Sequence, residues 1–297
     1  MRKGTPSRTA IKVARGIVWA GEQPDLASLL PVGAADSIRE LLVAAGQLSP
    51  WQLSLYRSAG FQALGGLMES RVMPGHLLSG VLRKRWVDDA ARRALADGVQ
   101  QVLSVGAGLD TLCYRLARED PSLVVELDHP ATSGVKRAGL EALGLPKNMQ
   151  LIGVDLARVG LVEALAGAPS WSSSRPSVII AEGVLMYLDE AAVVAFLAAA
   201  REASGPGSHL LLTTVGRDER GVVGPGLGAV KLMLAMAGEP LRWGIARSDL
   251  EPFLSANGWS LADCPSSDEL RSRYLTPTGQ GARPLAHDQD FVQAIRK

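Results

Sequence analysis

Apolar positions recur at two different spacings along the chain, and the spacing changes near residue 98. Before that point, segments such as DSIRELLVAAG and DDAARRALADG carry apolar residues three and four positions apart and end in glycine, which predicts helices. Beyond it, short apolar runs alternate with helix-like segments: VQQVLSVG, LVVELD, MQLIGVDL, SVIIAEGVLMYL and SHLLLTTV. Strands that alternate with helices predict parallel crossover connections and a sheet covered on both faces.

The pattern predicts an α/β chain in two parts, a helical N-terminal extension over residues 1–97 and a sheet core over residues 98–297. A glycine-rich and then strongly apolar stretch follows the fifth run, and we expect a lid insertion there at about residues 217–245. After it, RSDLEPFLSANG is typical of a helix that ends at a glycine. WSLADC then predicts a sixth strand and DFVQAIRK a last one.

The N-terminus is basic and then apolar, so it has to be compared with a signal peptide. Lys12 and Arg15 interrupt its apolar run, and Ile11, Ala14 and Val18 have helical spacing, which predicts an amphipathic helix. No stretch reaches the roughly 18 apolar residues of a membrane span. The net charge of +1 indicates no nucleic-acid or membrane partner. Two cysteines without metal-ligand spacing favour a cytoplasmic protein with no metal site.

In an open parallel sheet, ligands bind at the carboxyl ends of the strands, so the residues after each apolar run are the candidate site. The first run ends in GAGLDT, where Gly106 and Gly108 let the main chain approach a ligand without a Cβ in the way. A dinucleotide fingerprint needs a third glycine, but Thr111 stands at that position. Asp110 also brings a negative charge to the place of a pyrophosphate. The motif alone fits either a cofactor contact or a plain tight turn.

Acidic residues close the next three runs. Asp128 offers two acceptor oxygens to the hydroxyls of a ribose, with Glu126 as the alternative. Asp155 fits either an adenine amino group, beside the backbone of Leu156, or the N-cap of a helix. Glu182 follows a buried run and needs a cation, which a ligand or an arginine could supply. A ligand with ribose, adenine amino and ammonium groups but no pyrophosphate matches this set, and S-adenosylmethionine is such a ligand.

In this order and spacing, GAGLDT, ELDHP, VDL and AEGVLMYL resemble the leucine carboxyl methyltransferase family, whose bacterial branch contains many S-adenosylmethionine-dependent O-methyltransferases. SRTAIKVA, RKRWVDDA and EPLRWGIARSDLEPFLSANGW extend the resemblance over residues 5–260 or so. It implies a class I methyltransferase fold, a Rossmann-like sheet with the helical extension over the cofactor. It also implies contacts to the cofactor from Gly106 (methionine part), Asp128 (ribose), Asp155 and Leu156 (adenine) and Glu182 (ammonium).

The resemblance further implies an arginine for the cofactor carboxylate on the helix before the first strand. Arg83 fits this role, and Arg85 is its close rival. A second basic contact from the N-terminal helix falls on Arg8 or Lys12. The chain departs from the pattern of many bacterial members after GLDT and after VDL, which affects the acceptor side more than the cofactor side.

The nature of the acceptor follows from the bases that are available. A carboxylate is ionised at neutral pH and needs no base, whereas a phenol with a pKa of about 10 benefits from one. None of the four histidines has a convincing base position, which favours a carboxylate acceptor and a methyl ester product. Tyr187, Tyr114 and Arg217 are the candidates to hold it, and the apolar segment 225–238 is a candidate wall.

We therefore expect an S-adenosylmethionine-dependent O-methyltransferase that acts on a small molecule of the secondary-metabolite kind. The alternatives are a phenolic hydroxyl or a protein C-terminal carboxylate as acceptor. A more remote alternative is an NAD-dependent oxidoreductase, which the missing third glycine and Asp110 disfavour.

Overall fold

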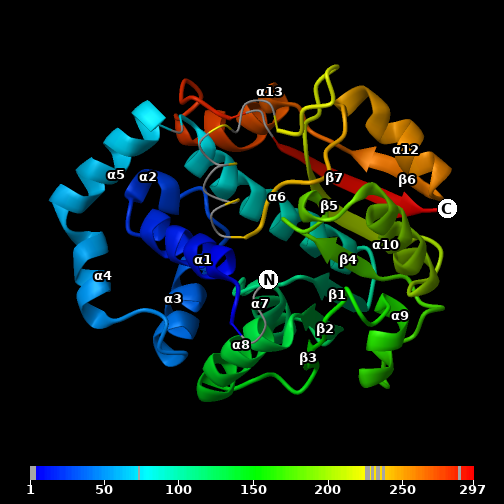
Figure 1. Cartoon of the computed structure of the whole chain (residues 1–297). Helices are drawn as coiled ribbons and strands as arrows, with labels where there is room; N and C mark the ends of the chain where they lie inside the picture. The colour runs from blue at the N-terminus through cyan, green and yellow to red at the C-terminus, as the bar shows by residue number, and fades with distance from the viewer. Residues whose placement is uncertain are drawn as a thin grey trace.

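A seven-stranded sheet lies between two layers of helices (Figure 1) in the computed structural model, which describes residues 5–72, 74–224, 228, 231, 235, 238–286 and 289–297. The strand order is β3-β2-β1-β4-β5-β7-β6. The first five strands pair in parallel, and β7 runs antiparallel between β5 and β6. The strands are β1 (Gln101–Val105), β2 (Leu123–Asp128), β3 (Met149–Gly153), β4 (Val178–Ala181), β5 (His209–Val215), β6 (Trp259–Asp263) and β7 (Gln289–Arg296). The parallel sheet and both C-terminal strands that the sequence predicts are confirmed.

The chain before β1 is helical, as its apolar spacing predicts. Its helices are α1 (Arg8–Gly21), α2 (Pro24–Ala27), α3 (Ala34–Ala44), α4 (Pro50–Arg57), α5 (Ala59–Val72) and α6 (His76–Ala96). The later α-helices are α7 (Leu112–Glu119), α8 (Pro130–Leu143), α9 (Leu161–Ala164), α10 (Glu190–Glu202), α12 (Leu250–Ala256) and α13 (Ser267–Leu270). Shorter helical turns are η1 (Leu165–Gly167), η2 (Leu185–Tyr187), η3 (Arg247–Asp249), η4 (Arg271–Leu275) and η5 (Thr276–Thr278).

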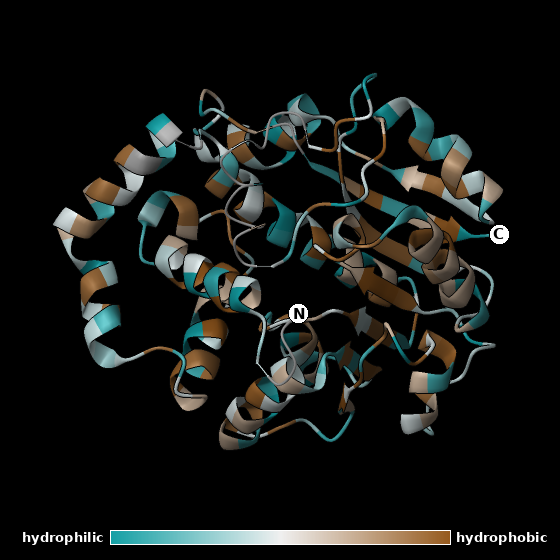
Figure 2. Cartoon of the chain, viewed as in Figure 1, coloured by the Kyte–Doolittle hydropathy of each residue, from teal (hydrophilic) through white to brown (hydrophobic). Residues whose placement is uncertain are grey.

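Alternate residues of the central strands enter two separate apolar layers. Val102 and Val124 belong to the layer under α1, α3, α6, α7 and α8, whereas Leu103 and Val125 belong to the layer under α9, α10 and α12. A strand buried on both faces must be apolar at successive positions, because side chains alternate across a sheet. Figure 2 shows this as nearly continuous brown strands between helices that carry both brown and teal. The continuous apolar runs of the sequence therefore mark the centre of the sheet.

The N-terminal helices share one core with the sheet. In α1, Ala14, Ile17 and Val18 are buried, so the predicted amphipathic helix is confirmed. Trp86 of α6 is fully buried in the same apolar cluster as Val102 of β1. The division of the chain near residue 97 stays a prediction. No helix in the described part of the chain is long and apolar enough to span a membrane.

The predicted lid insertion at about 217–245 is described only in part, because most of the apolar segment 225–238 within it lies outside the described residues. The insertion itself stays a prediction. The part before that segment forms a turn, in which Arg217 pairs with Val223. The part after it runs past η2, where the main-chain N–H groups of Arg242 and Trp243 donate to the carbonyl of Met186 at 2.8 and 3.2 Å.

A fully buried ion pair joins α8 to β2. The Lys136 ammonium lies 2.7 and 2.6 Å from the two carboxylate oxygens of Glu126, and the exposed fractions of the two side chains are 1% and 3%. Burial raises the pKa of Glu126, although the lysine opposes this shift. A charge this deep is tolerated only while its partner is present, because the cost of desolvating an unpaired ion is several kcal/mol.

We predict that Lys136→Met lowers the free energy of unfolding by about 3–5 kcal/mol, because it leaves the Glu126 carboxylate buried without a counter-ion. Urea denaturation measures the loss. The double variant Glu126→Gln/Lys136→Met removes both charges and is expected to recover most of it. A single variant as stable as the unmodified chain would show that the pair has no role in stability.

Candidate active site

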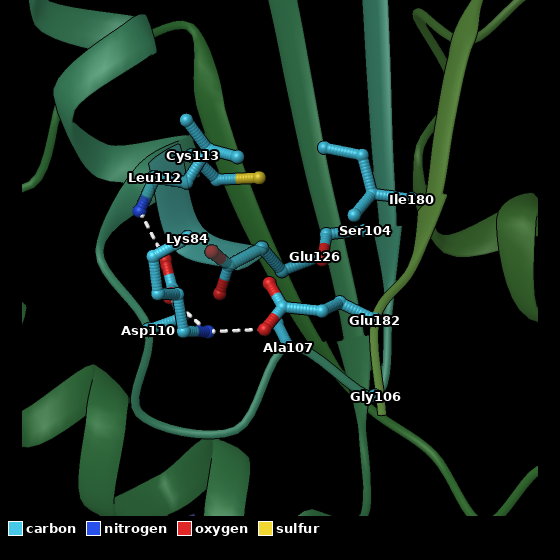
Figure 3. Close-up of a pocket in the computed structure, with 10 residues that line it drawn as sticks. All are labelled: Lys84, Ser104, Gly106, Ala107, Asp110, Leu112, Cys113, Glu126, Ile180 and Glu182. Carbon is cyan, nitrogen blue, oxygen red and sulfur yellow. Dashed lines mark hydrogen bonds and ion pairs between the residues drawn. The ribbon is translucent and has the colours of Figure 1, made fainter. Parts of the chain in front are cut away.

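The carboxyl ends of β1, β2 and β4 surround a pocket at the point where the strand order reverses. β1 is the first strand in the chain and lies between β2 and β4, so the loops after β1 and β4 diverge to opposite sides of the sheet. The pocket encloses about 330 Å³ including the solvent at its mouth. It is lined by Lys84, Ser104, Gly106, Ala107, Asp110, Leu112, Cys113, Glu126, Ile180 and Glu182. The sequence-predicted glycine turn and Glu182 therefore meet in one place (Figure 3).

The glycine turn after β1 is closely packed on both sides. Gly106 has a φ of +67°, and a Cβ there would lie 2.5 Å from Cγ2 of Val184. Gly108 has a φ of +57°, and a Cβ there would lie 3.3 Å from Cβ of Ala10 in α1. Both positions need a left-handed backbone that glycine adopts without strain. The start of α1 therefore lies directly against this turn.

Asp128, at the end of β2, faces the turn. Its carboxylate accepts hydrogen bonds from the main-chain N–H groups of Gly108 and His129, each at 2.6 Å. Burial raises the pKa of Asp128, and the two N–H donors partly offset this. A carboxylate has about four lone-pair sites, so the two that remain can accept hydroxyl donors. The alternative, Glu126, is engaged by Lys136 beneath the pocket.

Asp110 occupies the N-terminus of α7. One carboxylate oxygen accepts from the N–H of Leu112 at 2.6 Å, and the other lies 2.6 Å from the ammonium of Lys84. Burial is the largest single influence and disfavours the ionised form. The charge and hydrogen bond of Lys84, the charge of Arg115 and the N–H of Leu112 together outweigh burial and hold the pKa of Asp110 well below its usual range. A helix N-terminus is where a dinucleotide pyrophosphate binds. Here a protein carboxylate already fills that position, which argues against a dinucleotide.

Glu182, directly after β4, is held by two cations from α6. Its Oε1 accepts from Nε of Arg83 and from Nζ of Lys84, both at 2.7 Å. The exposed side-chain fractions are 14% for Arg83, 12% for Lys84 and 11% for Glu182. Figure 3 shows Lys84 reaching between Glu182 and Asp110. Arg83 also donates to Oε1 of Gln289 in β7 at 2.8 Å, so α6, β4 and β7 meet here.

The structure distinguishes the two arginines of α6. Arg83 contacts Glu182, whereas Nε of Arg85 lies 3.1 Å from both carboxylate oxygens of Asp89 on its own helix. The Arg85 guanidinium also lies over the ring of Tyr274, 5.9 Å from its centroid. Residues two positions apart on a helix face different directions, and of these two only Arg83 contacts Glu182.

Asp155 and Leu156 lie beyond β3, next to the strand of Asp128. The Asp155 carboxylate accepts from the N–H of Ala157 at 3.1 Å and is 40% exposed. It closes a turn and does not cap a helix, because the N-cap of the next helix, α9, is Gly160. The N–H of Val154 donates to the carbonyl of Asp128 at 2.8 Å, which places this segment beside the end of β2. Leu156 packs on the second apolar layer.

The three acceptor-side candidates lie in different places. Tyr187 ends η2, and burial raises its pKa, with a further rise from the charge of Glu239. Tyr114 is buried between α7 and α8, where its hydroxyl donates to the carbonyl of Leu143 at 3.5 Å. Arg217 is half exposed and lies 3.9 Å from the carboxylate of Glu190. None of the three is among the residues that line the pocket, and Tyr187 follows Glu182 by five positions in the loop after β4.

Sequence reasoning missed Lys84 as part of this site, and at the start of α1 it named Arg8 and Lys12 but not Ser7 or Ala10. The cluster RKR at 83–85 was the available signal for Lys84. Ser7 caps α1 and ties its start to two distant segments, since its N–H donates to Thr132 and its hydroxyl donates to Glu239, both at 3.1 Å. The other basic candidates, Arg8 and Lys12, lie on the exposed side of α1.

Comparison with known proteins gives the same class as the fold and the site. The sequence profile of the leucine carboxyl methyltransferase family matches residues 33–200. A Streptomyces coelicolor protein, assigned as an S-adenosyl-L-methionine-dependent methyltransferase, is 33% identical to this chain over 223 residues. The match covers 73% of this chain and 74% of that protein. Another, from Mycolicibacterium gilvum, is 27% identical over 308 residues, 97% of this chain and 92% of that protein. A crystal structure assigned as a methyltransferase from Thermobifida fusca has a TM-score of 0.56 at 20% identity, covering 92% of this chain and 98% of that one.

The fold is that of class I S-adenosylmethionine-dependent methyltransferases, and the chain is an enzyme of this class. It belongs to the leucine carboxyl methyltransferase family. The residues at and beside the pocket fit the cofactor, because the glycine turn lets the backbone approach closely and Asp128, bonded to that turn, keeps acceptor sites open. The same pocket offers both anions and cations, as a zwitterionic amino-acid group requires.

We predict that Gly106→Ala destabilises the fold more than Gly98→Ala. Both glycines have positive φ angles, +67° and +96°, but a Cβ at Gly98 would meet nothing within 4 Å. Gly98→Ala is expected to cost about 1–2 kcal/mol from backbone strain alone, and Gly106→Ala more, since Val184 must also move. Urea denaturation compares the two. Equal losses would mean that the turn tolerates a side chain and is not constrained by Val184.

Proposed function

We propose that this methyltransferase transfers a methyl group to a carboxylate oxygen of a small-molecule acceptor and forms a methyl ester. The cofactor supplies an activated methyl group on a sulfonium, so the protein's task is to align the acceptor and exclude water. The two cysteines are free thiols, which is in keeping with a reducing compartment, and we propose the cytoplasm.

The donor side of the proposal assigns each strand end a role. Gly106 and Gly108 let the main chain lie against the amino-acid part, and Asp128 accepts from the ribose hydroxyls. Glu182 receives the ammonium, and Arg83 receives the carboxylate of the same amino-acid part. Asp155 and Leu156 meet the adenine. What supports this set is that the turn, Asp128, Glu182 and Arg83 converge on the carboxyl ends of neighbouring strands.

The observation that carries the carboxylate acceptor is the placement of the histidines. No histidine lines the pocket in the described part of the chain. Nδ1 of His129 accepts from the N–H of Ala131 and so caps α8. His209 begins β5, at the amino end of that strand and away from the pocket, and hydrogen-bonds to Gln293. An acceptor that is already ionised needs no such base.

Tyr187 is our candidate to orient the acceptor. Because burial raises its pKa, the phenol keeps its proton at neutral pH and can donate a hydrogen bond to a carboxylate. A phenolic acceptor would need to lose a proton to a base, so we place a phenolic hydroxyl second, after a carboxylate. The third candidate, a protein C-terminal carboxylate, would require an open groove through which a peptide could enter.

The product distinguishes these acceptors. We predict that, with a radiolabelled methyl donor, the enzyme labels aryl carboxylates in preference to the matching phenols. Mild alkali is then expected to release the label as methanol, because an ester hydrolyses and an aryl methyl ether does not. Label that survives alkali, or that accumulates only on the phenols, would contradict the carboxylate assignment. Incubations without enzyme measure the background.

A further inference from the structure

Lys84 stands where two cavities meet. The pocket described above lies on one side of it, and a second cavity lies on the other, lined in part by Ile17 of α1 and Ile38 of α3. Lys84, Asp110 and Glu182 line both cavities. The ammonium bridges the two carboxylates at 2.6 and 2.7 Å, and the side chain is only 12% exposed. It therefore forms part of the partition between the cavities.

The charges around Lys84 are balanced without any ligand. Asp110 and Glu182 are the anions in direct contact with Lys84, and Arg83 shares Glu182 with it. Arg115, which also lines the second cavity, is paired with Asp88. Burial disfavours the ammonium, but the charges of Asp110 and Glu182 more than compensate and raise the pKa of Lys84. Lys84 is thus a charged group at neutral pH, held in place by both carboxylates.

The ammonium of the donor and that of Lys84 are the same chemical group, and under the proposed function both use Glu182. Oε1 of Glu182 already accepts from two cations of the protein, so a third cation at this carboxylate would be repelled by the other two. Lys84 can leave Glu182 without losing every partner, because Asp110 remains 2.6 Å away. Its flexible stem carries a compact charge that is suited to such a move.

We propose that Lys84 occupies the position of the donor's ammonium at Glu182 and has to withdraw toward Asp110 when the donor binds. This inference rests on the proposed role of Glu182. Lys84 then lowers the affinity only for ligands that carry the amino-acid part, because part of their binding free energy is used to move Lys84 away from Glu182. Ligands with the adenosine part alone leave the contact intact.

Titration calorimetry on the full chain tests the inference with two probes, S-adenosylhomocysteine and 5′-methylthioadenosine, which lacks the amino-acid group. Lys84→Met keeps the length of the side chain and removes its charge. If Lys84 is withdrawn from Glu182 in about one tenth of the unliganded molecules, Lys84→Met is expected to bind S-adenosylhomocysteine about tenfold more tightly. Its affinity for methylthioadenosine is expected to stay within about twofold of the unmodified value. Lys147→Met, at an exposed position in the loop after α8, is the matched control and is expected to change neither affinity.

A second variant keeps the test valid if the Asp110 carboxylate, left without Lys84, destabilises the chain. Lys84→Met/Asp110→Asn removes both charges, and it too is expected to bind S-adenosylhomocysteine more tightly than the unmodified protein. Thermal unfolding identifies which variants are folded. Unchanged or weaker binding of S-adenosylhomocysteine by the folded variants overturns the inference and makes Lys84 a structural or recruiting residue. If the unmodified protein binds neither probe, the proposed donor site itself is rejected.

Discussion

The ion pairs at the end of β4 connect the helical N-terminal region to the sheet at the site of the chemistry. Arg83 and Lys84 of α6 meet Glu182, 99 and 98 positions further along the chain, and Lys84 continues to Asp110 at the start of α7. Gln289 adds β7 on the far side. Four elements that are distant in sequence are thereby fixed around one carboxylate. This arrangement allows a polar pocket to exist at the carboxyl ends of the apolar central strands.

Charges at this depth carry a cost that good geometry has to offset. Each of these carboxylates has its own cation: Lys136 neutralises Glu126, and α6 neutralises Asp110 and Glu182. Asp128 differs from these carboxylates because main-chain N–H groups, and not a cation, are its closest donors. It is therefore the carboxylate best suited to neutral hydroxyls, whereas Glu182 is suited to a cation.

Much of the donor side could be predicted from the sequence because strand periodicity and strand ends are local features. Each apolar run gave a strand, and each residue after it gave a candidate contact. The partner of Glu182 could not be predicted, because spacing along a helix does not say which of Arg83, Lys84 and Arg85 faces a strand about 100 residues away. Tyr114 could not be placed from the sequence either. It was a candidate to hold the acceptor, but the structure buries it in α7, with its hydroxyl against the carbonyl of Leu143.

The central claim is that these strand ends bind S-adenosylmethionine through Asp128, and direct titration tests it. Calorimetry of the full chain with S-adenosylhomocysteine, with NAD in parallel, is expected to show micromolar binding of the first and none of the second. Asp128→Asn is expected to weaken that binding by about tenfold or more, since it removes the charge and one acceptor oxygen. Binding of NAD, or an Asp128→Asn variant that binds as tightly as the unmodified chain, would contradict the account.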